Sequence, residues 1–204
     1  DRTEFFSIAN RDVKAALQKE EALKTRHELD WLRWKDIDAT NISMAGAGGI
    51  RQVGRFMMMD KSQEFMTRLQ TEINAAKRGL INPQVNIHIF SGLSGGTGAG
   101  CFLDVCYMVK NVANSVGGIT TFGYFFLPDV NLEKIPISDT ATRAYIPQNG
   151  YAAIQELDYC MNLQYNGGAF VQEYQNHKRI EWNGAPVDMA HLICATDTNA
   201  NVIP

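Results

Sequence analysis

The chain has 204 residues, of which 45% are hydrophobic and 20% are charged, and its formal net charge is −3. This length and apolar content are sufficient for one globular core. The slightly acidic balance provides no attraction for nucleic acid or an anionic membrane, and the longest apolar runs are too short to cross a bilayer. We therefore expect no nucleic-acid partner and no membrane span.

The cysteines and histidines favour a reducing compartment and argue against a metal site. Cys101, Cys106, Cys160 and Cys194 form no Cys-x-x-Cys pair and lie largely in apolar segments, as buried thiols do. The charged N-terminus lacks the apolar run of a secretory signal. The four histidines are scattered without ligand spacing, so no metal ligand is assigned. A cytoplasmic protein is the resulting expectation.

The first third of the chain predicts helices around a glycine-rich turn. Residues 10–29 have a helical pattern, and residues 51–77 predict one long helix. Between them lies the turn Ala45-Gly46-Ala47-Gly48-Gly49, at the start of the long helix. Backbone N–H groups at a helix N-terminus suit a phosphate, so Ala47, Gly48 and Gly49 are candidate ligand-binding residues.

A second glycine-rich turn, Ser91 to Gly100, carries the strongest signal. It follows a predicted strand at 85–90, precedes a predicted helix at 101–114, and contains five glycines. Its candidate phosphate-binding residues are Ser94, Gly95, Gly96, Thr97 and Gly98. The alternative is a tight turn needed only for packing. A P-loop is excluded because no lysine lies between His88 and Lys110.

The remaining elements predict an α/β fold. A strand at 119–127, a helix at 147–162 and a strand at 189–196 continue the alternation, which predicts a mostly parallel sheet with helices on both faces. A ligand should lie at the carboxyl ends of these strands, where both glycine turns fall. Residues 170–174 and 179–182, bounded by glycine pairs or Asn-Gly, predict an antiparallel hairpin.

The segment Ser94 to Gly100 matches the tubulin signature Gly-Gly-Gly-Thr-Gly-Ser-Gly at five of seven positions. The chain therefore resembles the tubulin and FtsZ superfamily, in particular the bacterial tubulin-like proteins. The fragment Val53-Gly54-Arg55 and the order of the later segments are also similar to FtsZ. The resemblance implies a Rossmann-like GTPase domain that binds GTP or GDP with Mg²⁺ and self-associates into filaments or oligomers.

The resemblance also implies roles for single residues. It places the turn at Ala47 to Gly49 near the terminal phosphate, and Asn199 at the guanine-reading position, because an amide offers both a donor and an acceptor. The alternative for Asn199 is a cap or turn, and Asp197 competes for its role. Arg143 is a candidate for the phosphates or ribose, with a surface ion pair as the rival. Arg51 and Arg55 are candidates to steer phosphate, with a solvated helix face as the alternative.

In that superfamily, acidic residues of a neighbouring subunit complete hydrolysis, so GTPase activity is expected of the intact parent protein and no catalytic residue is assigned here. Residues 1–204 would form part of one nucleotide-binding domain. The first strand and its loop, the central helix and the second domain would lie outside them. The hairpin, as an insertion at about 167–186, would be a candidate surface for a partner protein.

Two other functions stay open. One is a scaffold of tubulin-like form that does not hydrolyse nucleotide. The other is a Rossmann-type NAD-dependent oxidoreductase, although Val116-Gly117-Gly118 occupies the region where an acidic ribose ligand is expected.

Overall fold

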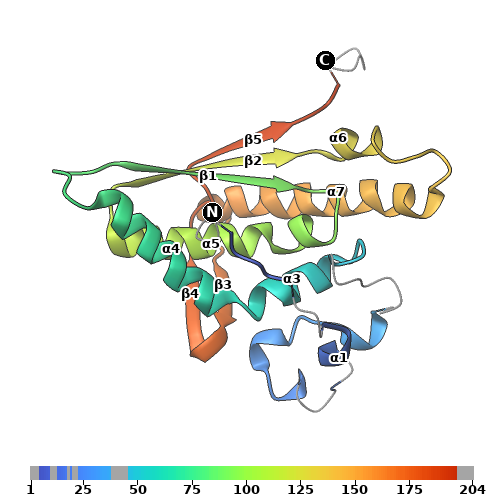
Figure 1. Cartoon of the computed structure of the whole chain (residues 1–204), viewed down its shortest axis with the longest axis horizontal. Helices are drawn as coiled ribbons and strands as arrows, with labels where there is room; N and C mark the ends of the chain where they lie inside the picture. The colour runs from blue at the N-terminus through green and yellow to red at the C-terminus, as the bar shows by residue number, and fades with distance from the viewer. Residues whose placement is uncertain (1–4, 10–12, 18, 20–22, 38–45, 197–204) are drawn as a thin grey trace.

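A parallel sheet with helices packed beneath it forms the centre of the molecule (Figure 1). The computed structural model describes residues 5–9, 13–17, 19, 23–37 and 46–196. The helices and short 3₁₀ turns of these ranges are α1 (Val13–Leu17), η1 (His27–Leu29), η2 (Trp34–Asp36), α3 (Arg51–Met59), α4 (Ser62–Lys77), α5 (Thr97–Val116), α6 (Pro128–Leu132), α7 (Thr140–Met161), α8 (Leu163–Asn166) and η4 (Gln175–His177). The strands are β1 (Val85–Gly92), β2 (Ile119–Phe126), β3 (Phe170–Tyr174), β4 (Lys178–Trp182) and β5 (Met189–Ile193).

The central sheet has the order β1-β2-β5, and both of its strand pairs are parallel. Gly92 at the end of β1 is paired with Phe126, and Phe126 is paired with Ile193 of β5. The three strands therefore end together, and the loops that follow them share one edge of the sheet. This confirms the predicted α/β class with a parallel sheet.

The helices α4, α5 and α7 cover one face of this sheet (Figure 1). Phe125 of β2 is fully buried, and its ring meets that of Phe102 in α5 edge to face, with centroids 5.3 Å apart. Ala153 and Leu157 of α7 belong to the same buried cluster. Burial of a phenylalanine side chain contributes about 1.5–3 kcal/mol, so this contact is a main attachment of α5 to the sheet.

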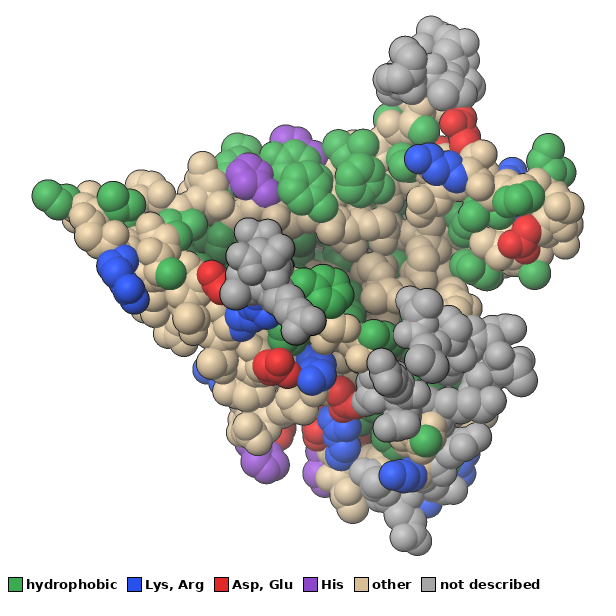
Figure 2. All heavy atoms as spheres, viewed as in Figure 1, with side chains coloured by type: hydrophobic (Ala, Val, Ile, Leu, Met, Phe, Trp, Pro, Cys, Tyr) green, Lys and Arg blue, Asp and Glu red, His purple; other side chains and the backbone are tan. Residues whose placement is uncertain are grey.

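The opposite face of the sheet carries a row of stacked rings. His88 lies 4.9 Å from Phe122, and Tyr124 lies 4.7 Å from Phe90 and 4.9 Å from His191, measured between ring centroids. Hydrophobic and histidine side chains gather along this face in Figure 2, and Phe90 is 64% exposed. The described helices thus cover one face, where the alternation predicted helices on both.

The long helix predicted at 51–77 is interrupted. It ends as α3 at Met59 and resumes as α4 at Ser62, whose hydroxyl donates to the Met59 carbonyl at 2.9 Å. Asp60, at the interruption, forms an ion pair with Arg26, and its carbonyl accepts a hydrogen bond from Gln175. Distant side chains therefore satisfy the groups freed at this break, and helical periodicity alone does not reveal them.

Two other helices begin earlier than predicted. Helix α5 starts at Thr97 rather than 101, inside the glycine turn. Helix α7 starts at Thr140 rather than 147, because the Asp139 side chain accepts a hydrogen bond from the Thr142 N–H at 3.0 Å and caps the helix. Pro147 then lies within the helix instead of opening it. Of the helical stretch predicted at 10–29, the described residues form α1 and η1.

The predicted hairpin is confirmed as β3 and β4, in which Phe170 is paired with Trp182. Its aromatic side chains face the body of the molecule. Phe170 stacks on Tyr107 of α5 at 3.8 Å between centroids, and Tyr174 is buried. The outward side of the hairpin carries exposed charged residues, among them Arg179 and Glu181.

The fold predicts very different reactivities for the four thiols. Cys101, Cys106 and Cys160 are buried, and Cys194 is exposed. Burial raises the pKa of Cys101 to about 12 and also raises the pKa of Cys106 and Cys160. At pH 8 we expect one fast thiol in a dithionitrobenzoate assay, because the thiolate is the reacting form. Cys194→Ser should remove this fast phase; a fast phase that persists would contradict the assignment.

Candidate functional site

The two glycine turns, almost 50 residues apart in the sequence, lie against each other at the carboxyl edge of the sheet. The backbone N–H of Ala47 in the first turn donates to the Thr97 hydroxyl of the second at 3.3 Å. A Cβ atom on Gly96 would lie 2.6 Å from the Ile50 nitrogen and 2.9 Å from the Ala47 Cβ. The absence of a side chain at Gly96 therefore allows this contact, and the structure joins two features that the sequence showed separately.

The helices behind the turns approach equally closely. A Cβ on Gly54 of α3 would lie 2.2 Å from the Gly96 carbonyl oxygen and 2.6 Å from the Thr97 Cα. Helix α3 therefore packs on the N-terminal end of α5 through backbone contacts. Packing alone therefore explains some of the glycines in this region. Only a glycine that is not needed for packing is evidence for a binding site.

Gly95 is such a glycine. A Cβ atom built on it would meet nothing within 4 Å, so its surface is open. The first hydrogen bond of helix α5 runs from the Gly100 N–H to the Gly96 carbonyl at 3.1 Å. The N–H groups of Thr97 and Gly98 therefore precede the first intrahelical bond and stand at the positive end of the α5 dipole. This end of α5 is suited to an anion.

The first turn has a backbone that favours glycine. Gly48 and Gly49 adopt positive φ angles of 58° and 82°. The ring of Tyr145 from α7 lies so close to Gly49 that a Cβ there would be 2.6 Å from it. These two residues, with Arg33 and Tyr145, also line a cavity of about 380 Å³. A substitution at Gly49 would thus meet both backbone strain and a steric clash.

Two asparagines hold the turns in place, and neither was among the candidate site residues from the sequence. The Asn149 side-chain amide, from α7, donates to the Gly49 carbonyl at 2.8 Å and to the Ser94 carbonyl at 3.1 Å. The Asn131 amide, from α6, donates to the Ser94 hydroxyl at 3.1 Å. Ser94 is fully buried, so its hydroxyl belongs to this internal network.

Asp129 organises the turn after β5. Its carboxylate accepts hydrogen bonds from the backbone N–H of Ala195 at 2.9 Å and of Thr196 at 3.3 Å. The loops after β2 and β5 are thereby joined at the same edge of the sheet as the glycine turns. The candidate guanine-reading residues Asn199 and Asp197 follow this turn and lie outside the described residues.

Arg143 is bound to backbone carbonyls at the end of α6 and just after it. Its guanidinium donates to the carbonyls of Leu132 at 2.7 Å and Ile135 at 2.9 Å. It therefore closes the segment between α6 and α7. These bonds are made to carbonyls and not to the carboxylate of the alternative ion pair, and a contact with the phosphates or ribose stays a prediction.

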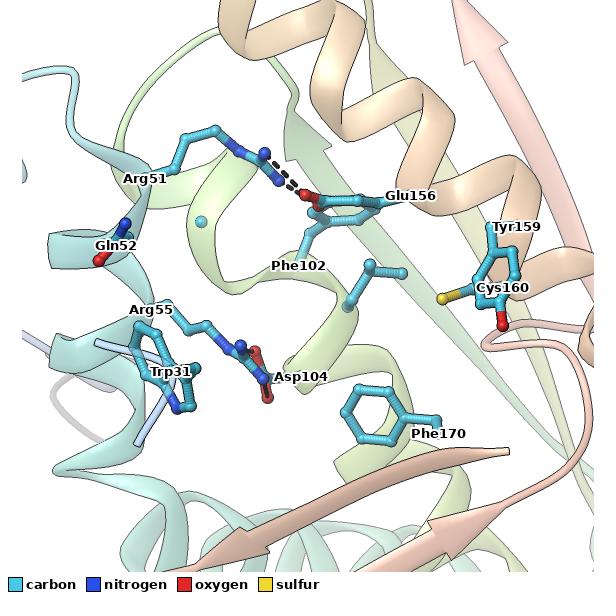
Figure 3. A pocket seen from close by; sticks show the side chains of 12 residues that line it. Trp31, Arg51, Gln52, Arg55, Phe102, Asp104, Glu156, Tyr159, Cys160 and Phe170 are labelled. Atoms are coloured by element: carbon cyan, nitrogen blue, oxygen red, sulfur yellow. Dashed lines mark hydrogen bonds and ion pairs between the residues drawn. The ribbon is translucent and has the colours of Figure 1, made fainter. Parts of the chain in front are cut away.

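Arg51 and Arg55 of α3 engage carboxylates, as Figure 3 shows. Arg51 forms an ion pair with Glu156 of α7, and its Nε donates to the Ala99 carbonyl at 3.1 Å. Arg55 forms an ion pair with Asp104 at 2.7 Å. Both lie along a cavity of about 330 Å³ between α3, α5, α7 and β3. Both arginines therefore form ion pairs with carboxylates of other helices, which the sequence did not predict, and a role in steering phosphate stays a prediction.

The Asp104 carboxylate is the centre of a buried network. It is almost fully buried, accepts two bonds from Arg55, and accepts a third from the Tyr174 hydroxyl at 2.8 Å. Burial opposes the charge of Arg55, but the neighbouring Asp104 outweighs it and raises the pKa of Arg55. Burial, together with the Asp104 charge, raises the pKa of Tyr174 well above its usual value. The Tyr174 hydroxyl therefore stays protonated, and its hydrogen bond to Asp104 joins the hairpin to α5.

Comparison with known proteins supports the family expected from the second glycine turn. A family model described as tubulin like matches residues 2–203. No curated protein and no solved structure matches the chain. In the described ranges, none of the helices has the length and apolar character needed to cross a membrane. The family match covers nearly the whole sequence and agrees with the parallel sheet and its paired glycine turns, and the chain therefore belongs to the tubulin-like family.

Proposed function

We propose that this chain is the nucleotide-binding part of a self-assembling GTPase. In this proposal the phosphates of GTP or GDP lie on the N–H groups from Gly95 to Gly98, and the turn at Ala47 to Gly49 borders the terminal phosphate. A neighbouring subunit supplies the carboxylates for hydrolysis, so catalysis depends on assembly into filaments or oligomers. Positioning and electrostatic stabilisation supply most of the catalysis in phosphoryl transfer, which suits a site divided between subunits.

One observation carries the proposal: two glycine turns meet at the carboxyl edge of a parallel sheet, beside the N-terminus of the 20-residue helix α5. The open surface of Gly95 leaves room for a ligand against the backbone. An anion at this point would be bound by amide groups and by the positive end of the helix dipole. Membership of the tubulin-like family favours GTP as that ligand.

Magnesium would come to the site with the nucleotide. In the part of the chain that the structure describes, there is no group of three or more His, Cys, Asp or Glu side chains suited to a metal ion. Mg²⁺ commonly keeps several water ligands and is bound through substrate phosphates with one or two carboxylates. We therefore assign no residue of this chain as a metal ligand.

Blocking Gly95 tests the proposal without disturbing the packing. Gly95→Leu places a side chain in open space, whereas any side chain on Gly96 would strike the first turn. We expect calorimetry with the intact parent protein to show Mg²⁺–GTP binding that Gly95→Leu weakens at least about tenfold, corresponding to about 1.4 kcal/mol. ATP and NAD, measured alongside, test the choice of nucleotide.

A matched control separates blocking from a general effect of an added leucine. Ala76→Leu also replaces a small residue with leucine, on the exposed side of α4 near the opposite edge of the sheet, and should bind GTP as the parent does. Binding of NAD but not GTP would favour the oxidoreductase alternative. No binding of any nucleotide would reject the GTPase proposal and leave a tubulin-like scaffold. Sedimentation with GTP and with GDP then tests whether assembly depends on the nucleotide.

A further inference from the structure

We propose that Asn149 is a positioning residue that sets the orientation of the phosphate-binding Ser94–Gly95 peptide in the second glycine turn and holds the Gly49–Ile50 peptide that closes the first. The inference rests on the proposed function in one respect only: it takes the ligand to be a nucleotide bound at these turns. The geometry points to it because one side-chain amide, from a different helix, reaches both turns at once, at 2.8 Å from the Gly49 oxygen and 3.1 Å from the Ser94 oxygen.

The Ser94 carbonyl belongs to the peptide that carries the Gly95 N–H, one of the proposed phosphate-binding groups. The Ser94 carbonyl and the Gly95 N–H are in the same planar trans peptide, where they point in opposite directions. A hydrogen bond that fixes the Ser94 carbonyl therefore also aims the Gly95 N–H away from Asn149. Since Gly95 has no atom within 4 Å of a built Cβ, its own surroundings do little to fix this peptide.

In the first turn, the hydrogen bond from Asn149 holds the conformation of the turn and does not aim a free N–H at a ligand. The Gly49 carbonyl shares a peptide with the Ile50 N–H, which donates to the Ala47 carbonyl at 2.9 Å and closes the turn. Gly48 and Gly49 both have positive φ angles, in a region that glycine populates about as readily as negative φ. An external hydrogen bond is thus an effective way to keep this turn in one conformation.

Helix α7 provides a rigid support for Asn149. Seven residues further on, and therefore on about the same side of the helix, Glu156 forms an ion pair with Arg51. Arg51 begins helix α3, two residues after Gly49, and also donates to the Ala99 carbonyl in the first helical turn of α5. Helix α7 therefore has two connections to this region, through Glu156 and through Asn149. Asn149 is the residue that contacts the glycine turns themselves.

The experiment compares Asn149→Ala, Asn149→Asp and the control Gln148→Ala in the parent protein. Gln148 is the exposed neighbour of Asn149 on the same helix. Amide exchange in the free protein reports the order of the two turns through Ile50, whose N–H closes the first turn, and through Leu93, whose N–H donates to the Phe126 carbonyl just before Ser94. Calorimetry reports Mg²⁺–GTP binding. Exchange of the hairpin β3–β4 and the melting temperature report whether a variant is folded.

We expect both Asn149 variants to accelerate exchange at Ile50 and Leu93 about tenfold and to weaken GTP binding about tenfold, as the loss of two hydrogen bonds suggests. Asn149→Asp should be at least as impaired as Asn149→Ala, because a carboxylate facing two carbonyls donates nothing. Gln148→Ala should match the parent in all measurements, and exchange in the hairpin should be unchanged.

The outcomes separate the two proposals. Unchanged exchange at Ile50 and Leu93 in Asn149→Ala would overturn the role of Asn149, whatever the nucleotide result. Normal GTP affinity in Asn149→Asp would overturn it as well. If exchange accelerates but the parent binds no nucleotide, Asn149 orders the turns as proposed and the nucleotide function is rejected. If a variant unfolds globally, the remaining Asn149 variant supplies the comparison.

Discussion

Gly54→Ala should destabilise the protein by about 3 kcal/mol, in the upper part of the range for overpacked sites. The added methyl group would lie 2.2 Å from the Gly96 carbonyl oxygen, and the two helices would have to move apart because backbone atoms cannot rotate away. Thermal unfolding should show a loss of about 10 °C for a chain of this size. The direction of the change in stability is the informative result. Alanine is favoured over glycine within a helix by about 1 kcal/mol, so a loss of stability shows that the steric overlap outweighs helix propensity.

Gly95→Ala is the matched control for this prediction. It makes the same chemical change on the neighbouring turn, where nothing lies within 4 Å of the new atom. Its melting temperature should agree with that of the parent to within about 2 °C, which corresponds to about 0.5 kcal/mol. If Gly54→Ala were as stable as the parent, α3 and α5 would not be packed through backbone contacts. The meeting of the two glycine turns would then lose its support.

Asp104→Ala should be the most damaging substitution away from the turns, with an expected loss of about 3–5 kcal/mol. The change leaves Arg55 largely buried without its carboxylate, and it removes the acceptor of the Tyr174 hydroxyl. Since Tyr174 belongs to β3 and Asp104 to α5, the attachment of the hairpin should weaken as well. Chemical denaturation, followed by tryptophan fluorescence, measures the loss.

The exposed pair Lys61–Glu64 provides the control for a buried pair. The side chains of these two residues are 38% and 62% exposed, and Glu64→Ala should cost no more than about 1 kcal/mol. The double variant Asp104→Leu with Arg55→Met should regain much of the stability that Asp104→Ala loses, because it removes both charges together. Equal losses for Asp104→Ala and Glu64→Ala would contradict the burial of this network.

Local patterns predicted the elements that lie around the site. Strands β1 and β2 follow from short apolar runs, and the hairpin follows from alternation between turn residues, because these patterns reflect contacts within a few residues. The interruption at Asp60 was missed because its partners, Arg26 and Gln175, are distant in the sequence. Helix α7 begins at Thr140 rather than at the predicted residue 147 because the Asp139 side chain caps it there.

The arginines at the site also have partners that are distant in the sequence. Arg51 and Arg55 lie just after a phosphate-type turn, so the sequence as the only guide allows either a role in steering phosphate or a place on a solvated helix face. Their partners Glu156 and Asp104 lie 105 and 49 positions further along the chain. A charge pattern cannot show which carboxylate folding brings beside an arginine, and only the structure shows that both side chains form ion pairs.

The sequence by itself determined the family, the α/β class and the two glycine turns, because glycine spacing and strand–helix alternation are local properties of the chain. Only the tertiary structure decided that the turns touch, that Gly54 and Gly96 are needed for packing while Gly95 is open, and that Asn149 bridges both turns. These facts depend on parallel strands ending at one edge and on α3 and α7 packing beside α5. Such contacts join residues that are far apart in sequence, and no local pattern records them.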